Sequence, residues 1–301
     1  MTARDPGDVV SDSPRAPTSV EQLQQQLADR AYLADRGLAT AVYLALRLGR
    51  PLLLEGDAGV GKTEAAKVLA SALDAPLIRL QCYEGIDVSQ ALYEWDYPRQ
   101  LLHLRAVEAA GSDPQAAEAD LYSRRFLLER PLLRAIQAPV PPVLLIDEID
   151  RADDEFEAFL LEVLADFQVT IPELGTITAD RPPIVVLTSN RTRELHEALR
   201  RRCLYHWIDH PTVEREAQII ALRAPQVAGP LADRIAQIIA RIRTLDLFKP
   251  PGVAESIDWA RVLSVLGVDD VTPEIAADTL GTVVKERDDM LRVRAALNDV
   301  L

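Results

Sequence analysis

Short apolar runs and longer segments of helical spacing alternate along the first two thirds of the chain. The apolar runs predict strands at 51–54, 77–81, 143–146, 184–187 and 205–208, and the helical spacing predicts two helices within 20–48 and one each at 63–73 and 155–164. The run 143–146 has no polar position, which is typical of a central parallel strand covered by helices on both faces. Strands that alternate with helices in this way predict an α/β fold, a doubly wound parallel sheet.

Three segments depart from this alternation. Residues 1–17 are polar and rich in proline, so we expect a disordered N-terminal tail. Residues 168–178 alternate in period two around a central PELG, which predicts a β-hairpin. After residue 210 the strand signals end and helical periodicity continues to the end of the chain. The expected organisation is the tail, an α/β domain at 18–210 that carries the hairpin, and a small all-helical domain at 211–301.

The stretch 84–138 is polar and rich in alanine and arginine, and we expect it to be mostly helical with an insertion. Four aromatic residues lie in it or next to it: Tyr83, Tyr93, Trp95 and Tyr97. Because aromatic side chains bury large areas, a place in the core is favoured over a substrate-gripping surface.

Composition and charge narrow the class of protein. The 301 residues include 48% hydrophobic and 27% charged ones, as in soluble globular proteins. The net charge of −14 disfavours a nucleic-acid substrate, since the protein would repel phosphates. Cys82 and Cys203 lie in apolar surroundings and are expected to be buried thiols in a reducing compartment. No secretory h-region and no run of 18 apolar residues occur, so a cytoplasmic protein without a membrane span is expected.

A glycine-rich loop lies directly between the first strand and the helix that follows it. Its sequence GDAGVGKT matches the G-x-x-x-x-G-K-[ST] phosphate-binding motif in full. Lys62 is expected to reach the β- and γ-phosphates of a bound nucleotide, and the Thr63 hydroxyl to ligate Mg²⁺. The alternative is a chance glycine-rich turn, which the flanking strand and helix disfavour. The expected nucleotide-binding residues here are Gly56, Asp57, Ala58, Gly59, Val60, Gly61, Lys62, Thr63 and Glu64.

Two carboxylates follow the apolar strand at 143–146. Asp147 is expected to hold Mg²⁺ through water, and Glu148 to polarise the attacking water as a general base. An Asp-Glu pair after an apolar run can also be two solvated charges at a strand end. Together with the phosphate-binding loop, the pair predicts a site for nucleotide hydrolysis with Mg²⁺.

Further candidates follow the strand at 184–187. Asn190 could orient the attacking water, or it could cap a helix predicted at 193–199. Arg201 and Arg202 end that helix, where cations are favourable in any case. In the functional interpretation, one of them is an arginine finger that contacts the γ-phosphate of a nucleotide bound to a neighbouring subunit.

The chain resembles the AAA+ ATPases over nearly its whole folded length. The resemblance lies in the order of four features: the phosphate-binding loop, Asp147-Glu148, Asn190 and the terminal arginine. The hairpin at 168–178 is similar to their pre-sensor hairpin, and the stretch after Gln81 to a helix-2 insertion. Within that superfamily the motifs LEG, DEIDRA and LEVL at 54–56, 147–152 and 161–164 resemble the MoxR family. The motifs QCYEG and WDY at 81–85 and 95–97 are similar to its CoxD-like branch, which is associated with maturation of molybdenum hydroxylases.

This resemblance implies an ATPase that acts as a chaperone or remodelling motor. It implies ATP and Mg²⁺ as cofactors and a homo-oligomeric ring, with a hexamer expected. It also implies a partner with a von Willebrand A domain and a client metalloenzyme. It also implies that Arg202, with Arg201 as the near alternative, is the arginine finger and that the helical domain is a lid. A departure occurs where the family has a sensor arginine in a Ser-Pro-Arg sequence, because this chain reads Ser256-Ile257-Asp258. Arg261, one turn later, is either a substitute or a solvated helix residue.

Two other classes of function remain as alternatives. One is a nucleotide-dependent switch or scaffold with little turnover, against which the intact Glu148 argues. The other is a nucleic-acid motor of the related clade, which the net charge disfavours.

Overall fold

The computed structural model describes residues 16–110 and 120–301. They form a five-stranded parallel sheet in the order β2-β5-β8-β1-β9. The strands are β1 (Leu52–Gly56), β2 (Leu77–Gln81), β5 (Val143–Asp147), β8 (Ile184–Ser189) and β9 (Leu204–Ile208). Each strand predicted from an apolar run is present, and the doubly wound parallel sheet is confirmed. The N-terminal tail predicted for 1–17 lies, except for its last two residues, outside the described residues.

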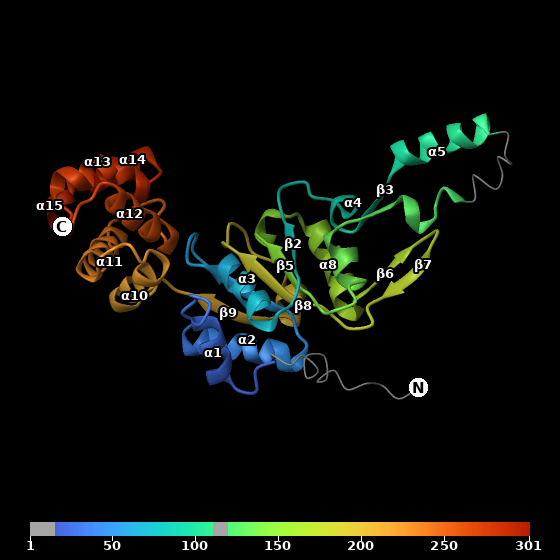
Figure 1. Cartoon of the computed structure of the whole chain (residues 1–301), viewed down its shortest axis with the longest axis horizontal. Coiled ribbons are helices and arrows are strands. Elements are labelled where there is room, and N and C mark those ends of the chain that lie inside the picture. The colour runs from blue at the N-terminus through green and yellow to red at the C-terminus, as the bar shows by residue number, and fades with distance from the viewer. Residues whose placement is uncertain (1–15, 111–119) are drawn as a thin grey trace.

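Helices cover both faces of this sheet (Figure 1). Alternate residues of β5, an interior strand, enter different cores: Leu144 and Ile146 join one cluster, and Val143 and Leu145 the other. The first core includes residues of α7 (Pro131–Ile136), α8 (Asp154–Asp166) and α9 (Glu197–Arg202). The second includes residues of α1 (Val20–Ala28), α2 (Arg36–Leu48) and α3 (Lys62–Leu73). Burial on both faces explains why this strand has no polar position before Asp147.

The segment between β2 and β5 differs from its predicted helical structure. It contains α4 (Val88–Ala91), β3 (Tyr93–Trp95), α5 (Tyr97–Ala109), β4 (Leu127–Glu129) and α7, with a 3₁₀ turn at Arg124–Phe126. β3 and β4 form a small antiparallel sheet, which the helical prediction missed. The predicted aromatic core is correct for Trp95, which is buried, and Tyr93 is half-buried. It is wrong for Tyr83 and Tyr97, which are 44% and 62% exposed. α5 lies at the end of the molecule away from the C-terminal helices (Figure 1).

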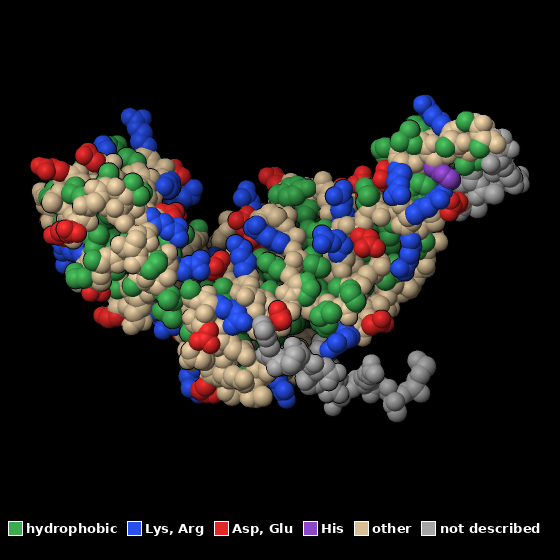
Figure 2. Space-filling view, viewed as in Figure 1, with side chains coloured by type: hydrophobic (Ala, Val, Ile, Leu, Met, Phe, Trp, Pro, Cys, Tyr) green, Lys and Arg blue, Asp and Glu red, His purple; other side chains and the backbone are tan. Residues whose placement is uncertain are grey.

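The predicted hairpin is present as β6 (Gln168–Ile171) and β7 (Gly175–Thr178), which pair antiparallel. After β9 the described chain is helical. Its helices are α10 (Val213–Arg223), α11 (Gly229–Arg243), α12 (Val253–Val265), α13 (Pro273–Val283), α14 (Arg287–Ala295) and α15 (Leu297–Val300). They enclose a third core of their own, centred on residues such as Ile235, Ile239 and Trp259. The surface is hollowed between these helices and the rest of the molecule (Figure 2).

In the part of the chain that the structure describes, no helix is both long and apolar enough to cross a membrane.

Candidate functional site

The glycine-rich loop joins the end of β1 to the start of α3, as its motif predicts. Gly59 and Gly61 have φ angles of 78° and 98°, a backbone region that favours glycine. Gly61 is the N-cap of α3 and no side chain caps this helix, so its first N–H groups stay available to a ligand. A helix N-terminus of this kind attracts anions, and phosphate above all.

Lys62 folds back over this loop. Its buried ammonium group donates to the carbonyl oxygens of Gly56 at 2.7 Å and Asp57 at 2.6 Å. Burial lowers the pKa of Lys62, while the nearby carboxylates of Asp150, Asp57, Asp147 and Glu148 oppose that shift. A cation held by neutral carbonyls in a buried place can exchange them for phosphate oxygens, which bind it more strongly.

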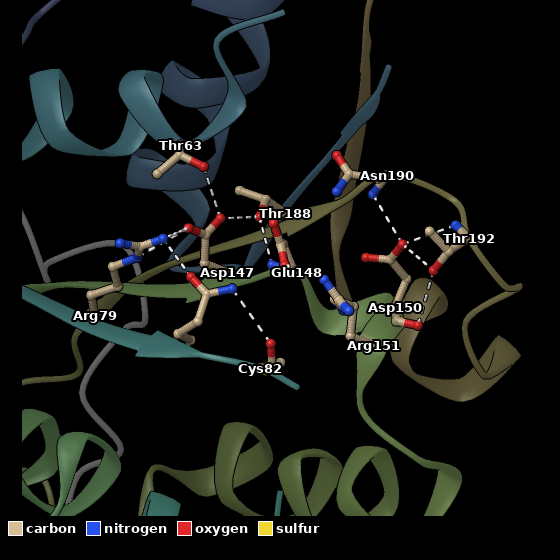
Figure 3. A network of polar contacts seen from close by, with 11 residues as sticks. Thr63, Arg79, Cys82, Asp147, Glu148, Asp150, Arg151, Thr188, Asn190 and Thr192 are labelled. Carbon is tan, nitrogen blue, oxygen red and sulfur yellow. Dashed lines mark hydrogen bonds and ion pairs between the residues drawn. The ribbon is translucent and has the colours of Figure 1, made fainter. Parts of the chain in front are cut away.

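Asp147 is the centre of the polar network in Figure 3. It ends β5 and is only 2% exposed. Its Oδ1 accepts hydrogen bonds from the hydroxyls of Thr63 at 2.9 Å and Thr188 at 2.5 Å. Its Oδ2 accepts from Arg79, at 3.0 Å from Nε and at 2.5 Å from a terminal nitrogen. The structure thus brings together the two predicted magnesium-site residues and adds Thr188 and Arg79, which the sequence prediction missed.

Glu148 follows in a strained conformation, with φ at 55° in the left-handed region. Its backbone N–H donates to the Thr188 hydroxyl at 2.9 Å, which pins this turn to β8. Its carboxylate lies 3.6 Å from Arg151 and lines the same cavity as Lys62. The strained turn therefore directs the predicted general base away from the buried core and into the cavity.

Asn190 lines this cavity too, directly after β8. The alternative that it caps a helix is wrong, because α9 begins at Glu197 with His196 as its N-cap. The buried Asp150 holds the segment: its Oδ2 accepts from the backbone N–H groups of Asn190 at 3.2 Å and Thr192 at 2.9 Å, and from the Thr192 hydroxyl at 2.7 Å. Sequence reasoning missed this role, although Asp150 belongs to the acidic group that begins at Asp147.

Two adjoining cavities meet at the glycine-rich loop. One, of about 280 Å³, is lined by Lys62, Thr63, Asp147, Glu148 and Asn190 among others. The second, of about 380 Å³, lies between the α/β part and the C-terminal helices, and its lining includes Tyr32, His210, Ile219 and Ile257. Gly59, Gly61, Glu64 and Ala254 line both. The smaller cavity, with its charged and polar side chains, suits the phosphates of a nucleotide. The larger and more apolar cavity beside it suits the base.

The donors in the smaller cavity suit Mg²⁺. The Thr63 hydroxyl and the Asp147 carboxylate are hard oxygen ligands, 2.9 Å apart, beside the place where the loop would hold phosphates. Mg²⁺ is usually held by one or two such side chains together with water and substrate phosphates. The residues present therefore fit this ion.

The structure does not bring Arg201 or Arg202 to the cavity of its own chain. Arg201 is exposed and pairs with Glu197 at 2.5 Å on the same helix. The Arg202 guanidinium donates to the Leu161 carbonyl. The backbone carbonyls of both arginines accept hydrogen bonds from Arg50, which fixes the end of α9 beside β1. Neither arginine therefore lines the two cavities at the phosphate-binding loop.

The C-terminal region meets the loop through the start of α12. Backbone N–H groups of Val253 and Ala254 donate to the Gly59 carbonyl, at 3.0 Å and 3.4 Å. Ser256 is buried and donates to Glu216 at 2.5 Å. Arg261 pairs with Asp258 at 3.2 Å and lines neither cavity, whereas Arg223 lines the larger one.

Arg223 also forms an ion pair with Glu64, at 2.9 Å. Glu64 follows Thr63 in the first turn of α3, and it lines both cavities. This pair therefore links the C-terminal helices to the helix that carries the phosphate-binding loop.

The chain is similar to one protein family and to a characterised relative. A family model described as AAA domain, dynein-related subfamily, matches residues 51–203. The denitrification regulatory protein NirQ of Pseudomonas aeruginosa is 24% identical over 209 residues, which cover 67% of this chain and 70% of NirQ.

Among solved structures, the RuvB Holliday junction branch migration motor of Thermotoga maritima has 20% identity and a TM-score of 0.45, over 92% of this chain and 74% of RuvB. A substituted form of the same RuvB has 21% identity and a TM-score of 0.48, over 91% of this chain and 75% of that chain.

Proposed function

The chain belongs to the dynein-related subfamily of AAA domains, and on this premise we propose that it binds ATP with Mg²⁺ and hydrolyses it to ADP and phosphate. The observation that carries the proposal is the hydrogen bond from Thr63 to Asp147 in the cavity that Lys62 and Glu148 also line. It joins the phosphate-binding loop to the acidic strand end at the place where Mg²⁺ would bridge phosphate oxygens.

The polar residues that were predicted from the sequence each have a proposed role in this reaction. The loop N–H groups and Lys62 would bind and neutralise the phosphates. Thr63 and Asp147 would hold Mg²⁺, Thr63 directly and Asp147 through water, and the ion would supply charge stabilisation at the transferred phosphoryl group. Glu148 accepts a proton from the attacking water, and Asn190 orients that water in line with the γ-phosphate. The adjoining apolar cavity takes the base and ribose. Glu64 lies at the boundary of the two cavities.

We further propose a ring of identical subunits, with six as the expected number. Arg202, or Arg201 beside it, would reach the γ-phosphate of the neighbouring subunit, because neither reaches the cavity of its own chain. An arginine supplied between subunits makes hydrolysis depend on assembly. Residues 211–301 are proposed to act as a lid that moves against the domain at 18–210.

For the biological role we propose a MoxR-like chaperone or remodelling ATPase, of the CoxD-like branch, that acts with a von Willebrand A-domain partner. Its proposed client is a metalloenzyme of the molybdenum hydroxylase type. The motifs at 81–85 and 147–152 support this proposal, as does the similarity to a protein named for regulating denitrification. The likeness to RuvB is too distant to extend RuvB's action to this chain, and the net charge of −14 disfavours a nucleic-acid motor.

The test is steady-state ATP hydrolysis together with molecular mass by light scattering, with and without Mg-ATP. The variants are Glu148→Gln and Arg202→Ala, with Glu162→Gln on the exposed side of α8 as the matched control. We expect the wild type and the control to hydrolyse ATP as a nucleotide-stabilised oligomer. Glu148→Gln should bind ATP without turnover, and Arg202→Ala should keep the oligomer but lose activity.

Two outcomes would contradict the proposal. A wild-type monomer with no turnover at any nucleotide concentration would favour a switch or scaffold. Turnover that rises strongly when DNA is added would favour the nucleic-acid motor.

A further inference from the structure

The side chain of Arg79 reaches the buried carboxylate from the side away from the phosphate-binding loop. β2 and β5 pair in parallel, with Arg79 opposite Leu145 and Gln81 opposite Asp147. The Arg79 side chain extends along the strands by two residues, from the level of Leu145 to that of Asp147. Its guanidinium contacts Asp147 Oδ2 through two nitrogens, at 3.0 Å and 2.5 Å. The same terminal nitrogen also donates to the Gln81 side-chain oxygen. Figure 3 shows Arg79 and Thr63 on different sides of the carboxylate.

The two oxygens of Asp147 thus have separate partners. Oδ1 faces the hydroxyls of Thr63 and Thr188, and Oδ2 faces Arg79. Only Oδ1 is on the side where Mg²⁺ would lie, so the arginine can keep its contact when the metal binds. A carboxylate that is 2% exposed is costly to bury without a positive partner. Arg79 supplies that partner from within the chain.

We propose that Arg79 is a positioning residue that acts through Asp147, as a counter-charge that lowers the affinity of the site for Mg²⁺. This inference rests on the proposed function. Arg79 orients the carboxylate before the metal arrives, and its positive charge repels a divalent cation across the carboxylate group. Mg²⁺ therefore binds tightly only when the phosphates of a nucleotide add their negative charge. As a consequence, the metal and the nucleotide bind to the site together.

The consequence for Arg79→Gln is a change in two opposite directions. The nucleotide-free protein becomes less stable to heat, because the buried Asp147 carboxylate loses the positive charge that pairs with it. At the same time the site binds Mg²⁺ more tightly. A residue that served only to support the fold would give the first effect without the second.

The experiment is a Mg²⁺ titration of the binding of a fluorescent ADP analogue by the full chain. We expect the Mg²⁺ concentration at half-maximal binding to fall about three- to tenfold in Arg79→Gln, since one repelling charge is removed. Arg79→Lys keeps the charge but not the contact through two nitrogens, so its midpoint should lie closer to the wild-type value than that of Arg79→Gln does. Arg130→Gln is the matched control, since Arg130 pairs with Glu94 at 2.6 Å on the β3–β4 sheet and should leave the titration unchanged.

A midpoint in Arg79→Gln that equals or exceeds the wild-type value overturns the inference. If that variant fails to fold, Gln81→Leu replaces it. This change removes the oxygen that holds the guanidinium beside Asp147, so the midpoint should fall in the same direction by a smaller factor, and an unchanged midpoint overturns the inference. A wild type that binds no nucleotide with Mg²⁺ would instead contradict the proposed function itself.

Discussion

Gly252 lies so close to Gly59 that a Cβ atom added to Gly252 would stand 2.7 Å from the Gly59 Cα. The first residue is the N-cap of α12 in the C-terminal region, and the second is part of the phosphate-binding loop. Val253 N–H also donates to the Gly59 carbonyl at 3.0 Å. The phosphate-binding loop and the C-terminal helices are therefore in direct backbone contact. The binding of a ligand at the loop would then depend on the position of α12 as well as on the loop itself.

Substitution of Gly252 should weaken nucleotide binding. A methyl group at this position has no space, so Gly252→Ala must push α12 away from the loop, at a cost of about 1–3 kcal/mol. We expect the affinity for Mg-ADP to fall by about tenfold or more, since α12 helps to close both cavities. Gly229→Ala is the control, because a Cβ there meets nothing within 4 Å. Equal affinity in the two variants, measured by fluorescence titration, would refute the expected clash.

Loss of the Asp150 carboxylate should reduce hydrolysis more than binding. In Asp150→Ala the backbone N–H groups of Asn190 and Thr192 lose a shared acceptor in part-buried surroundings, which costs about 0.5–1.5 kcal/mol for each hydrogen bond. Asn190 then leaves its place, so we expect turnover to fall by about tenfold or more while ATP still binds. Asp154→Ala removes an exposed carboxylate that pairs with Arg193 at 3.3 Å and serves as the control. Wild-type turnover in Asp150→Ala would show that Asn190 needs no such support.

Two arginines of the C-terminal helices, Arg223 in α10 and Arg261 in α12, should differ in importance for nucleotide binding. Arg223 pairs with Glu64 at the boundary of the cavities, whereas Arg261 pairs with Asp258 away from them. A partly exposed ion pair contributes about 0–1 kcal/mol, so Arg223→Ala should lower nucleotide affinity by about two- to fivefold. Arg261→Ala should have no effect. A larger loss in Arg261→Ala, measured in the same titration, would restore Arg261 as the substitute for the missing sensor arginine.

The two thiols should make stability depend on pH in the alkaline range. Burial raises the pKa of Cys82 and of Cys203 to about 12, from an ordinary value of 9.0. The folded chain thus keeps both protons while the unfolded chain loses them above pH 9. The contribution of the thiols to stability is full below pH 9 and declines from there toward pH 12.

This decline is measured by urea unfolding at pH 8 and pH 10.5. The double variant Cys82→Ala, Cys203→Ala should lose less stability between these pH values than the wild type does. An identical loss in both proteins would show that the thiols titrate at their ordinary pKa in the folded chain.

The aromatic group and the short β3–β4 sheet show where prediction from sequence failed. β3 has three residues and adjoins helices on both sides, so its pattern is too short to separate a strand from a helix. Trp95 is buried and Tyr97 is exposed although both are aromatic and two residues apart. Composition predicts that aromatics favour burial, but which of them is buried depends on the surface that the fold places against them.

The sequence by itself determined the phosphate-binding loop, the acidic pair Asp147-Glu148 and the parallel α/β sheet. These features depend on residues that are neighbours in the chain, where the spacing of glycines or of apolar positions leaves few conformations open. The tertiary structure alone decided the further partners of Asp147, because Arg79 comes from β2 and Thr188 from β8. These segments meet only through the strand order β2-β5-β8-β1, which departs from the order of the chain. No local pattern encodes a contact between residues that are brought together by strand pairing across such separations.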